Sequence, residues 1–138
     1  MERHQHSKKY IVFYVSEIIC WTVYFYLFGI DFSDEGWKND PETYHGIELI
    51  VGEVTDLQFK NTVDVITMWH YLEHDYKPQI HLKQLLDITH SKTKLLIEVP
   101  NFDSFTRRKF AQHWAGYHTP RHTALYSPKS LEILLKNS

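Results

Sequence analysis

The stretch "VDVITMWHYLEHDYKPQIHLKQLLDITHS", residues 63–91, decides the fold class that the sequence predicts. It begins with the apolar run "VDVITM", which is rich in β-branched residues and typical of a buried strand. Pro78 then begins a segment with the spacing of an amphipathic helix, in which the apolar positions are Ile80, Leu82, Leu85, Leu86 and Ile88. A strand followed closely by a helix is the repeating unit of a parallel α/β sheet.

The same alternation continues on both sides of this stretch. "YFYLFGID" is an apolar run that ends on Asp31, and the polar segment after it offers Ser33 as the N-cap of a short helix. "IELIVGEVTDL" and "KTKLLIEVP" are further strand-like runs, and "SPKSLEILLKNS" predicts a helix capped by Ser127 with Pro128 at its first position. We therefore expect a Rossmann-like α/β fold with a parallel sheet.

Polar and aromatic residues follow the predicted strands at the points where each strand ends. Asp31 ends one run, Glu53 closely follows the next, and Trp69 and His70 follow "VDVITM". Ligands of parallel α/β sheets bind beyond the carboxyl ends of the strands, so we expect these residues to share one rim. Each also has a structural alternative, namely a helix-capping Asp31, an exposed loop Glu53, a core Trp69 and a surface cluster that contains His70.

Length and composition restrict the number of domains and the kinds of partner that we expect. The chain has 138 residues, 43% of them hydrophobic, which suits one domain with one core. A net charge of −2 gives no field that would attract nucleic acid. The single Cys20 excludes an intrachain disulfide and suits a reducing compartment, so we expect a cytoplasmic protein.

One segment allows two interpretations. Tyr10–Ile30 is 21 residues long with a single formal charge, Glu17, and its length fits a membrane span. Its Tyr, Phe, Val and Ile content is instead typical of buried strands, and Glu17 would be costly in lipid. We expect strands or a core helix here, with a membrane anchor as the alternative.

"HYLEH", residues 70–74, spells the H-x-x-E-H pattern of a family of zinc peptidases. On one continuous helix His70, Glu73 and His74 would share a face. His70 directly follows a strand, however, so we expect it in the strand-to-helix turn, with Glu73 bonded to backbone N–H groups. A metallohydrolase remains the alternative interpretation of this motif.

Five pieces of sequence together carry a family resemblance. They are "GIDFS", "VGEVTDLQF", "VDVITMWHYLEHDYKP", "KLLIEVPNFDSF" and "TPRHTALYSPKSLEILL". In this order and spacing they resemble the class I S-adenosylmethionine-dependent methyltransferases, in the branch with "LEH" after the fourth strand. The resemblance covers roughly residues 28–136 and implies S-adenosylmethionine as cofactor and a small-molecule methyl acceptor.

The resemblance implies a role for each matching position. Asp31 would hold the cofactor ribose, Glu53 the adenine amino group, and the backbone of Val54 would contact the ring. Trp69 would line the cofactor pocket. His70 and His74 would lie toward the acceptor, where an imidazole can remove its proton.

The resemblance assigns no metal ligand, but it leaves one alternative open. Some relatives with E-x-x-E-H at this place bind a divalent ion, with a later His as partner. In this sequence His70 stands at the first position, and Glu73, His74 and His122 would be the remaining ligands. Imidazole-rich sets of this kind suit zinc or manganese.

Two features of the family pattern are missing. No glycine occurs in residues 1–28, where the glycine-rich turn that approaches the cofactor's methionine end is expected. The last two strands of the usual seven also lack residues. We therefore divide the chain into an atypical segment, 1–27, and a partial methyltransferase domain, 28–138. We expect a truncated or degenerate enzyme that binds S-adenosylmethionine weakly, with a non-catalytic remnant or interaction module as the alternative.

Overall fold

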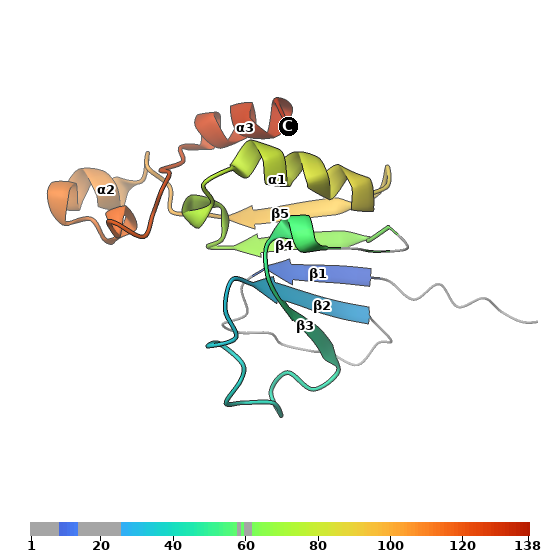
Figure 1. The fold of residues 1–138 in the computed structure, drawn as a ribbon. Helices are drawn as coiled ribbons and strands as arrows, with labels where there is room; N and C mark the ends of the chain where they lie inside the picture. The colour runs from blue at the N-terminus through green and yellow to red at the C-terminus, as the bar shows by residue number, and fades with distance from the viewer. Residues whose placement is uncertain (1–8, 14–25, 58, 60–61) are drawn as a thin grey trace, which may run out of the picture.

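The computed structural model describes residues 9–13, 26–57, 59 and 62–138. Its centre is a parallel sheet with the strand order β3-β2-β1-β4-β5 (Figure 1). The strands are β1 (Lys9–Phe13), β2 (Tyr26–Asp31), β3 (Ile47–Val51), β4 (Val65–Trp69) and β5 (Lys94–Glu98). The predicted Rossmann-like α/β class is confirmed.

The central position of the sheet is filled by β1, the segment "KYIVF". Phe13 pairs with Ile30 of β2 on one side and with Met68 of β4 on the other. The boundary that the sequence predicts between residues 27 and 28 falls inside this sheet, within β2. The missing glycine-rich turn was expected within residues 1–28, of which residues 1–8 and 14–25 lie outside the described residues.

The segment Tyr10–Ile30 begins in β1 and ends in β2, so the structure is incompatible with one continuous membrane helix over that range. Across the part of the chain that the structure describes, no helix has the length and apolar content needed to span a membrane. The strand interpretation of the two ends of this segment is therefore the correct one.

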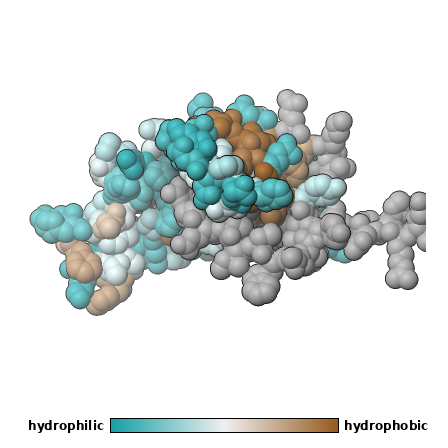
Figure 2. All heavy atoms as spheres, turned by 90° about the horizontal axis from the view of Figure 1, so that it is seen from below, coloured by the Kyte–Doolittle hydropathy of each residue, from teal (hydrophilic) through white to brown (hydrophobic). Residues whose placement is uncertain are grey.

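The core lies between the sheet and α1 (Pro78–Leu85), which Figure 1 shows lying over β4 and β5. Ile66 and Met68 are buried and alternate with the less buried Val65 and Thr67, as the period of a strand requires. Seen from below in Figure 2, much of the described surface is hydrophilic, with an apolar patch near the centre and further apolar atoms at the left end. Burial of the apolar face of β4 is what fixes α1 on the sheet.

The predicted apolar stripe after Pro78 is only partly correct. α1 ends at Leu85 and continues as the short 3₁₀ helix η3 (Leu86–Ile88). Ile80 and Leu86, which were expected inside, are 53% and 58% exposed. The face that packs on the core is set by Leu85 and Ile88, and the position four residues before Leu85 belongs to His81, which is buried.

The short helix predicted after Ser33 is not formed. Residues 35–39 and 41–46 are turns, although the Ser33 hydroxyl does accept a hydrogen bond from the Glu35 N–H at 3.1 Å. Gly36 weakens a helix at this point, and Pro41 restricts the residue before it to extended conformations. The cap chemistry was thus correctly predicted, but the helix was not.

Two further helices follow β5. α2 (Phe105–Phe110) begins after Ser104, and α3 (Pro128–Lys136) lies beside α1 (Figure 1). The predicted cap of α3 is confirmed, because the Ser127 hydroxyl accepts a hydrogen bond from the Ser130 N–H at 3.1 Å. Asn101 and Tyr126 form a parallel bridge that holds the chain between the two helices against the sheet.

Candidate functional site

The carboxyl ends of β2, β3 and β4 open on one edge of the sheet, because all neighbouring strands are parallel. Asp31 is the last residue of β2, Trp69 is the last residue of β4, and Glu53 follows β3 by two residues. Trp69 is 38% exposed, so it is not a core residue. The three residues lie along the edge predicted from their sequence positions, and their contacts with a ligand remain predictions.

The loop after β3 holds Glu53 in a fixed position. The Glu53 N–H donates to Asp56 Oδ2 at 2.8 Å, and the Asp56 N–H donates to the Glu53 carbonyl oxygen at 2.9 Å. These bonds begin the 3₁₀ helix η1 (Val54–Asp56), in which Val54 is buried. A Cβ at Gly52 would lie 2.7 Å from Asp56 Oδ2, so glycine permits this loop. The Glu53 side chain, 55% exposed, extends from it.

His70 lies in the turn after β4, before the 3₁₀ helix η2 (Leu72–His74), as the sequence predicts. Its φ of 51° is in the left-handed region. Its Nδ1 is 3.0 Å from Glu73 Oε1, and its Nε2 is 3.2 Å from Glu98 Oε1. Since both ring nitrogens contact carboxylates, His70 can position Glu73, and its predicted catalytic role stays a prediction.

Glu73 is buried, and its carboxylate does not bond backbone N–H groups as the sequence analysis expected. Oε1 contacts His70, whereas the main-chain carbonyl oxygen of Glu73 accepts the N–H groups of Thr123 and Ala124 at 2.7 and 3.2 Å. Oε2 is buried, and no group of the described residues donates a hydrogen bond to it. A buried carboxylate oxygen without a donor is costly, which marks this atom as a place for a ligand.

Hydrogen bonds at Nδ1 fix the ring orientations of His74 and His122 and so determine which nitrogen of each ring can accept a hydrogen bond. The Nδ1 of His74 is 3.0 Å from the Arg121 carbonyl oxygen, and the Nδ1 of His122 is 2.8 Å from the Gly116 carbonyl oxygen. A carbonyl oxygen only accepts, so each Nδ1 carries the hydrogen. In the neutral form each Nε2 is therefore an acceptor. The two rings lie 4.8 Å apart, centre to centre.

Glu73, His74 and His122 could together hold a metal ion. Their ligand atoms lie within 4.8 Å of one another, and the carbonyl partners of both imidazoles are the kind of second contact that orients metal-binding histidines. His70 is not a member of this group among the described residues. The set is therefore different from the peptidase arrangement, which needs both histidines of H-x-x-E-H as ligands.

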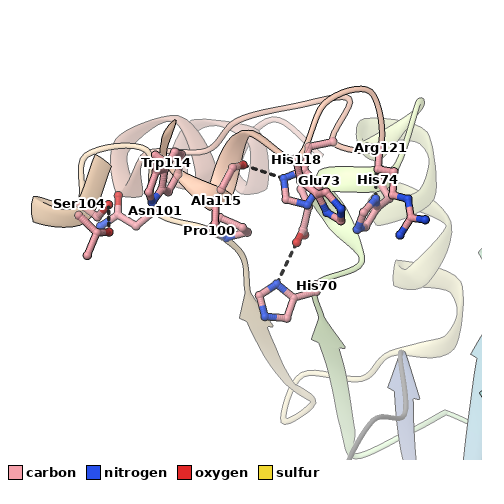
Figure 3. A pocket seen from close by; sticks show the side chains of 13 residues that line it. His70, Glu73, His74, Pro100, Asn101, Ser104, Trp114, Ala115, His118 and Arg121 are labelled. Atoms are coloured by element: carbon pink, nitrogen blue, oxygen red, sulfur yellow. Dashed lines mark hydrogen bonds and ion pairs between the residues drawn. The ribbon is translucent and has the colours of Figure 1, made fainter. Parts of the chain in front are cut away.

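These histidines line a pocket of about 640 Å³, which we call the histidine pocket (Figure 3). Its walls come from the turn after β4, from Pro100 and Asn101 after β5, and from residues 114–122. Trp114 is one of the lining residues, and Gly116 leaves room for it, because a Cβ at Gly116 would lie 2.2 Å from the indole ring. The pocket thus combines an aromatic wall with proton-accepting groups.

A second pocket of about 250 Å³ lies beside the first and includes Phe32, Glu53 and His81; we call it the Glu53 pocket. His74 lines both pockets. His81 is not among the residues predicted from the sequence, although its spacing from Leu85 and Ile88 indicates a buried helical face. Asp75, the buried carboxylate that bonds His81, was not predicted either.

Two buried tyrosines beside these pockets stay protonated at neutral pH. Burial, with smaller effects from the charges of Asp75 and Glu73, raises the pKa of Tyr126 to about 12. Burial and the neighbouring carboxylates also raise the pKa of Tyr71. Neither phenol can act as a general base near pH 7, which leaves the imidazoles and carboxylates that line the two pockets as candidate proton acceptors.

Comparison with known proteins decides the family. A family model described as "Methyltransferase domain" matches residues 14–138. The chain belongs to the class I S-adenosylmethionine-dependent methyltransferase family. The match includes the positions of Asp31, Glu53 and Trp69. No curated protein matches the sequence of this methyltransferase chain.

Two solved structures resemble the fold of this methyltransferase domain. A crystal structure from Nostoc punctiforme, named "putative O-methyltransferase", aligns with a TM-score of 0.60 at 17% identity over 82% of this chain. The N-terminal domain of EvdMO1 with SAH bound aligns with a TM-score of 0.54 at 12% identity over 96% of this chain. This chain spans 38% and 64% of those two chains, respectively.

Proposed function

We propose that this chain is an S-adenosylmethionine-dependent methyltransferase domain that transfers a methyl group to a nucleophilic atom of a small-molecule acceptor. In this proposal the cofactor lies along Asp31, Glu53, Val54 and Trp69, and the acceptor lies in the histidine pocket. The observation that carries the proposal is that His74 lines both pockets. The methyl donor and the acceptor must lie next to each other for transfer. In this proposal His74 lies between the cofactor in the Glu53 pocket and the acceptor in the histidine pocket.

For methyl transfer the protein mainly has to position the cofactor and the acceptor and to remove the acceptor's proton. The sulfonium of S-adenosylmethionine supplies an already activated methyl group. The acceptor's oxygen, nitrogen or carbon would form the new bond to the methyl carbon as the carbon–sulfur bond breaks. S-adenosylhomocysteine would then leave, and the acceptor's proton would pass to an imidazole. The Nε2 atoms of His74 and His122 fit this role, because their Nδ1 atoms are held by carbonyl oxygens.

The residues present fit the ribose and adenine parts of the cofactor better than its amino-acid end. Asp31 and Glu53 supply acceptors at the strand ends, whereas residues 1–28 contain no glycine for a close backbone approach. Each lost hydrogen bond to a charged group weakens binding by about 1.5–3 kcal/mol. We therefore expect cofactor affinity in the millimolar range.

The proposal is tested with methyl-labelled S-adenosylmethionine and a panel of small hydroxyl and amine acceptors. We expect labelled product with the wild type, and a rate lower by about 10²-fold or more with His74→Gln, the size of effect typical for a general base. His113→Gln, a change at an exposed histidine outside both pockets, is the matched control. A folded wild type that neither transfers label nor retains cofactor would instead be the non-catalytic remnant.

A second candidate is metal-assisted methyl transfer, favoured by the unpartnered Glu73 Oε2 beside two imidazoles. A divalent ion bound there would lower the pKa of an acceptor hydroxyl. The test is calorimetric titration with zinc or manganese alone. We expect binding that His122→Gln removes and His113→Gln leaves unchanged. If His122→Gln and His113→Gln bind the metal equally well, Glu73, His74 and His122 are not the metal site.

A further inference from the structure

We propose that Glu53 and His81 form a two-acceptor site for the exocyclic amino group of an adenine ring. His81 would then determine whether an amino-purine or an oxo-purine binds in the Glu53 pocket. This inference rests on the proposed function, because it places the purine of the cofactor in that pocket. It adds a residue of α1, outside the strand ends, to the binding site.

The orientation of His81 is fixed by a buried carboxylate. His81 Nδ1 lies 2.8 Å from Asp75 Oδ2, and the other Asp75 oxygen accepts the Lys77 N–H at 2.7 Å. Both side chains are buried, with 6% and 1% of their surfaces exposed. The carboxylate of Asp75 accepts only, so Nδ1 of His81 carries the hydrogen. The tautomer and the ring direction are therefore set before any ligand arrives.

The other nitrogen of His81 faces a second carboxylate. Nε2 is 3.8 Å from Glu53 Oε2, which is too far for a direct hydrogen bond. In neutral His81 both atoms are acceptors, so they repel rather than bind each other. A primary amino group has two hydrogens that point in different directions and can donate one to each atom. The carbonyl oxygen of an oxo-purine in the same place would face two acceptors without a hydrogen to share.

The rest of the pocket suits a flat ring. Phe32 stacks nearly parallel on Tyr71, with ring centres 5.3 Å apart and an interplanar angle of 7°. Phe32 is 47% exposed and lines the same pocket as Glu53 and His81. An aromatic surface beside two acceptors selects a planar heterocycle with an amino group over an aliphatic amine.

The test compares adenosine and inosine, which differ at this one group, by NMR titration of the wild type and of His81→Asn. The amide nitrogen of asparagine takes the place of Nδ1 and keeps the bond to Asp75, but it leaves no atom at Nε2. We expect the wild type to prefer adenosine about tenfold, and His81→Asn to reduce that preference to about twofold or less. His113→Asn, a change at an exposed histidine, should leave it unchanged.

Glu53→Gln provides a second variant, at a side chain that is 55% exposed, where substitutions usually change stability little. It replaces one acceptor by an amide and should also reduce the preference. An unchanged preference in His81→Asn, or a wild type that does not distinguish the nucleosides, would overturn the inference.

A parallel titration with S-adenosylhomocysteine separates this inference from the proposed function. If it binds while His81→Asn leaves the purine preference unchanged, the role of His81 fails and the methyltransferase proposal stands. If the adenosine preference depends on His81 but S-adenosylhomocysteine does not bind, the amino-group site stands and the methyltransferase proposal fails.

Discussion

At the scale of single residues, Gly116 determines whether Trp114 and His122 reach their places. A Cβ at position 116 would lie 2.2–2.6 Å from three atoms of the indole, so Gly116→Ala must displace the ring. We expect a loss of about 1–3 kcal/mol in the free energy of unfolding, as for other overpacked sites. Urea denaturation measures it. Gly36→Ala, where a Cβ meets nothing within 4 Å, should change it by less than about 0.5 kcal/mol.

Tyr126 makes stability depend on pH in the alkaline range. Its pKa in the folded chain is about 12, above the ordinary value of 10.0. The folded state therefore favours the protonated phenol, and this contribution is complete below pH 10.0 and is lost as the pH rises toward 12. We expect Tyr126→Phe to reduce the fall in melting temperature over this interval. An equal fall in both proteins would show that Tyr126 is not the group responsible.

At the scale of elements, α1 is held by one face only. Leu85 is 3% exposed and packs in the core, whereas its neighbour Leu86 is 58% exposed. Leu85→Ala should lower the free energy of unfolding by about 2–5 kcal/mol, and Leu86→Ala by less than about 0.5 kcal/mol. Chemical denaturation of the two variants checks this. Similar losses for both would mean that the helix packs with a different face.

The sequence predicted elements better than it predicted side-chain partners. Strand ends could be located from apolar runs that stop at Asp31 and Trp69, and Ser127 with Pro128 marked the start of α3. The pairing of Glu73 with His70 could not be predicted, because it depends on the left-handed turn at His70. The contribution of residues 114–122 to the histidine pocket could not be predicted either, because it depends on the path that the chain takes after β5.

At the scale of the whole molecule, the central position of β1 is what makes the sheet continuous. Its amides pair with β2 on one side and β4 on the other, in a segment for which the sequence left strands and a core helix as alternatives. We expect the slowest hydrogen exchange at amides of β1, β2 and β4, and faster exchange in the edge strands β3 and β5. If β1 exchanges as fast as an unstructured peptide, the strand order is wrong at its centre.

The most direct test of the account is a ¹⁵N–¹H NMR titration of the wild type with S-adenosylhomocysteine at millimolar concentrations. Binding at the carboxyl edge predicts that the largest shift changes occur at residues 31–33, 53–54 and 69–77, around His74 and the Glu53 pocket. Saturating changes confined to other regions, such as α3, or a spectrum that does not change, would contradict the claim that this edge is the cofactor side of a methyltransferase site.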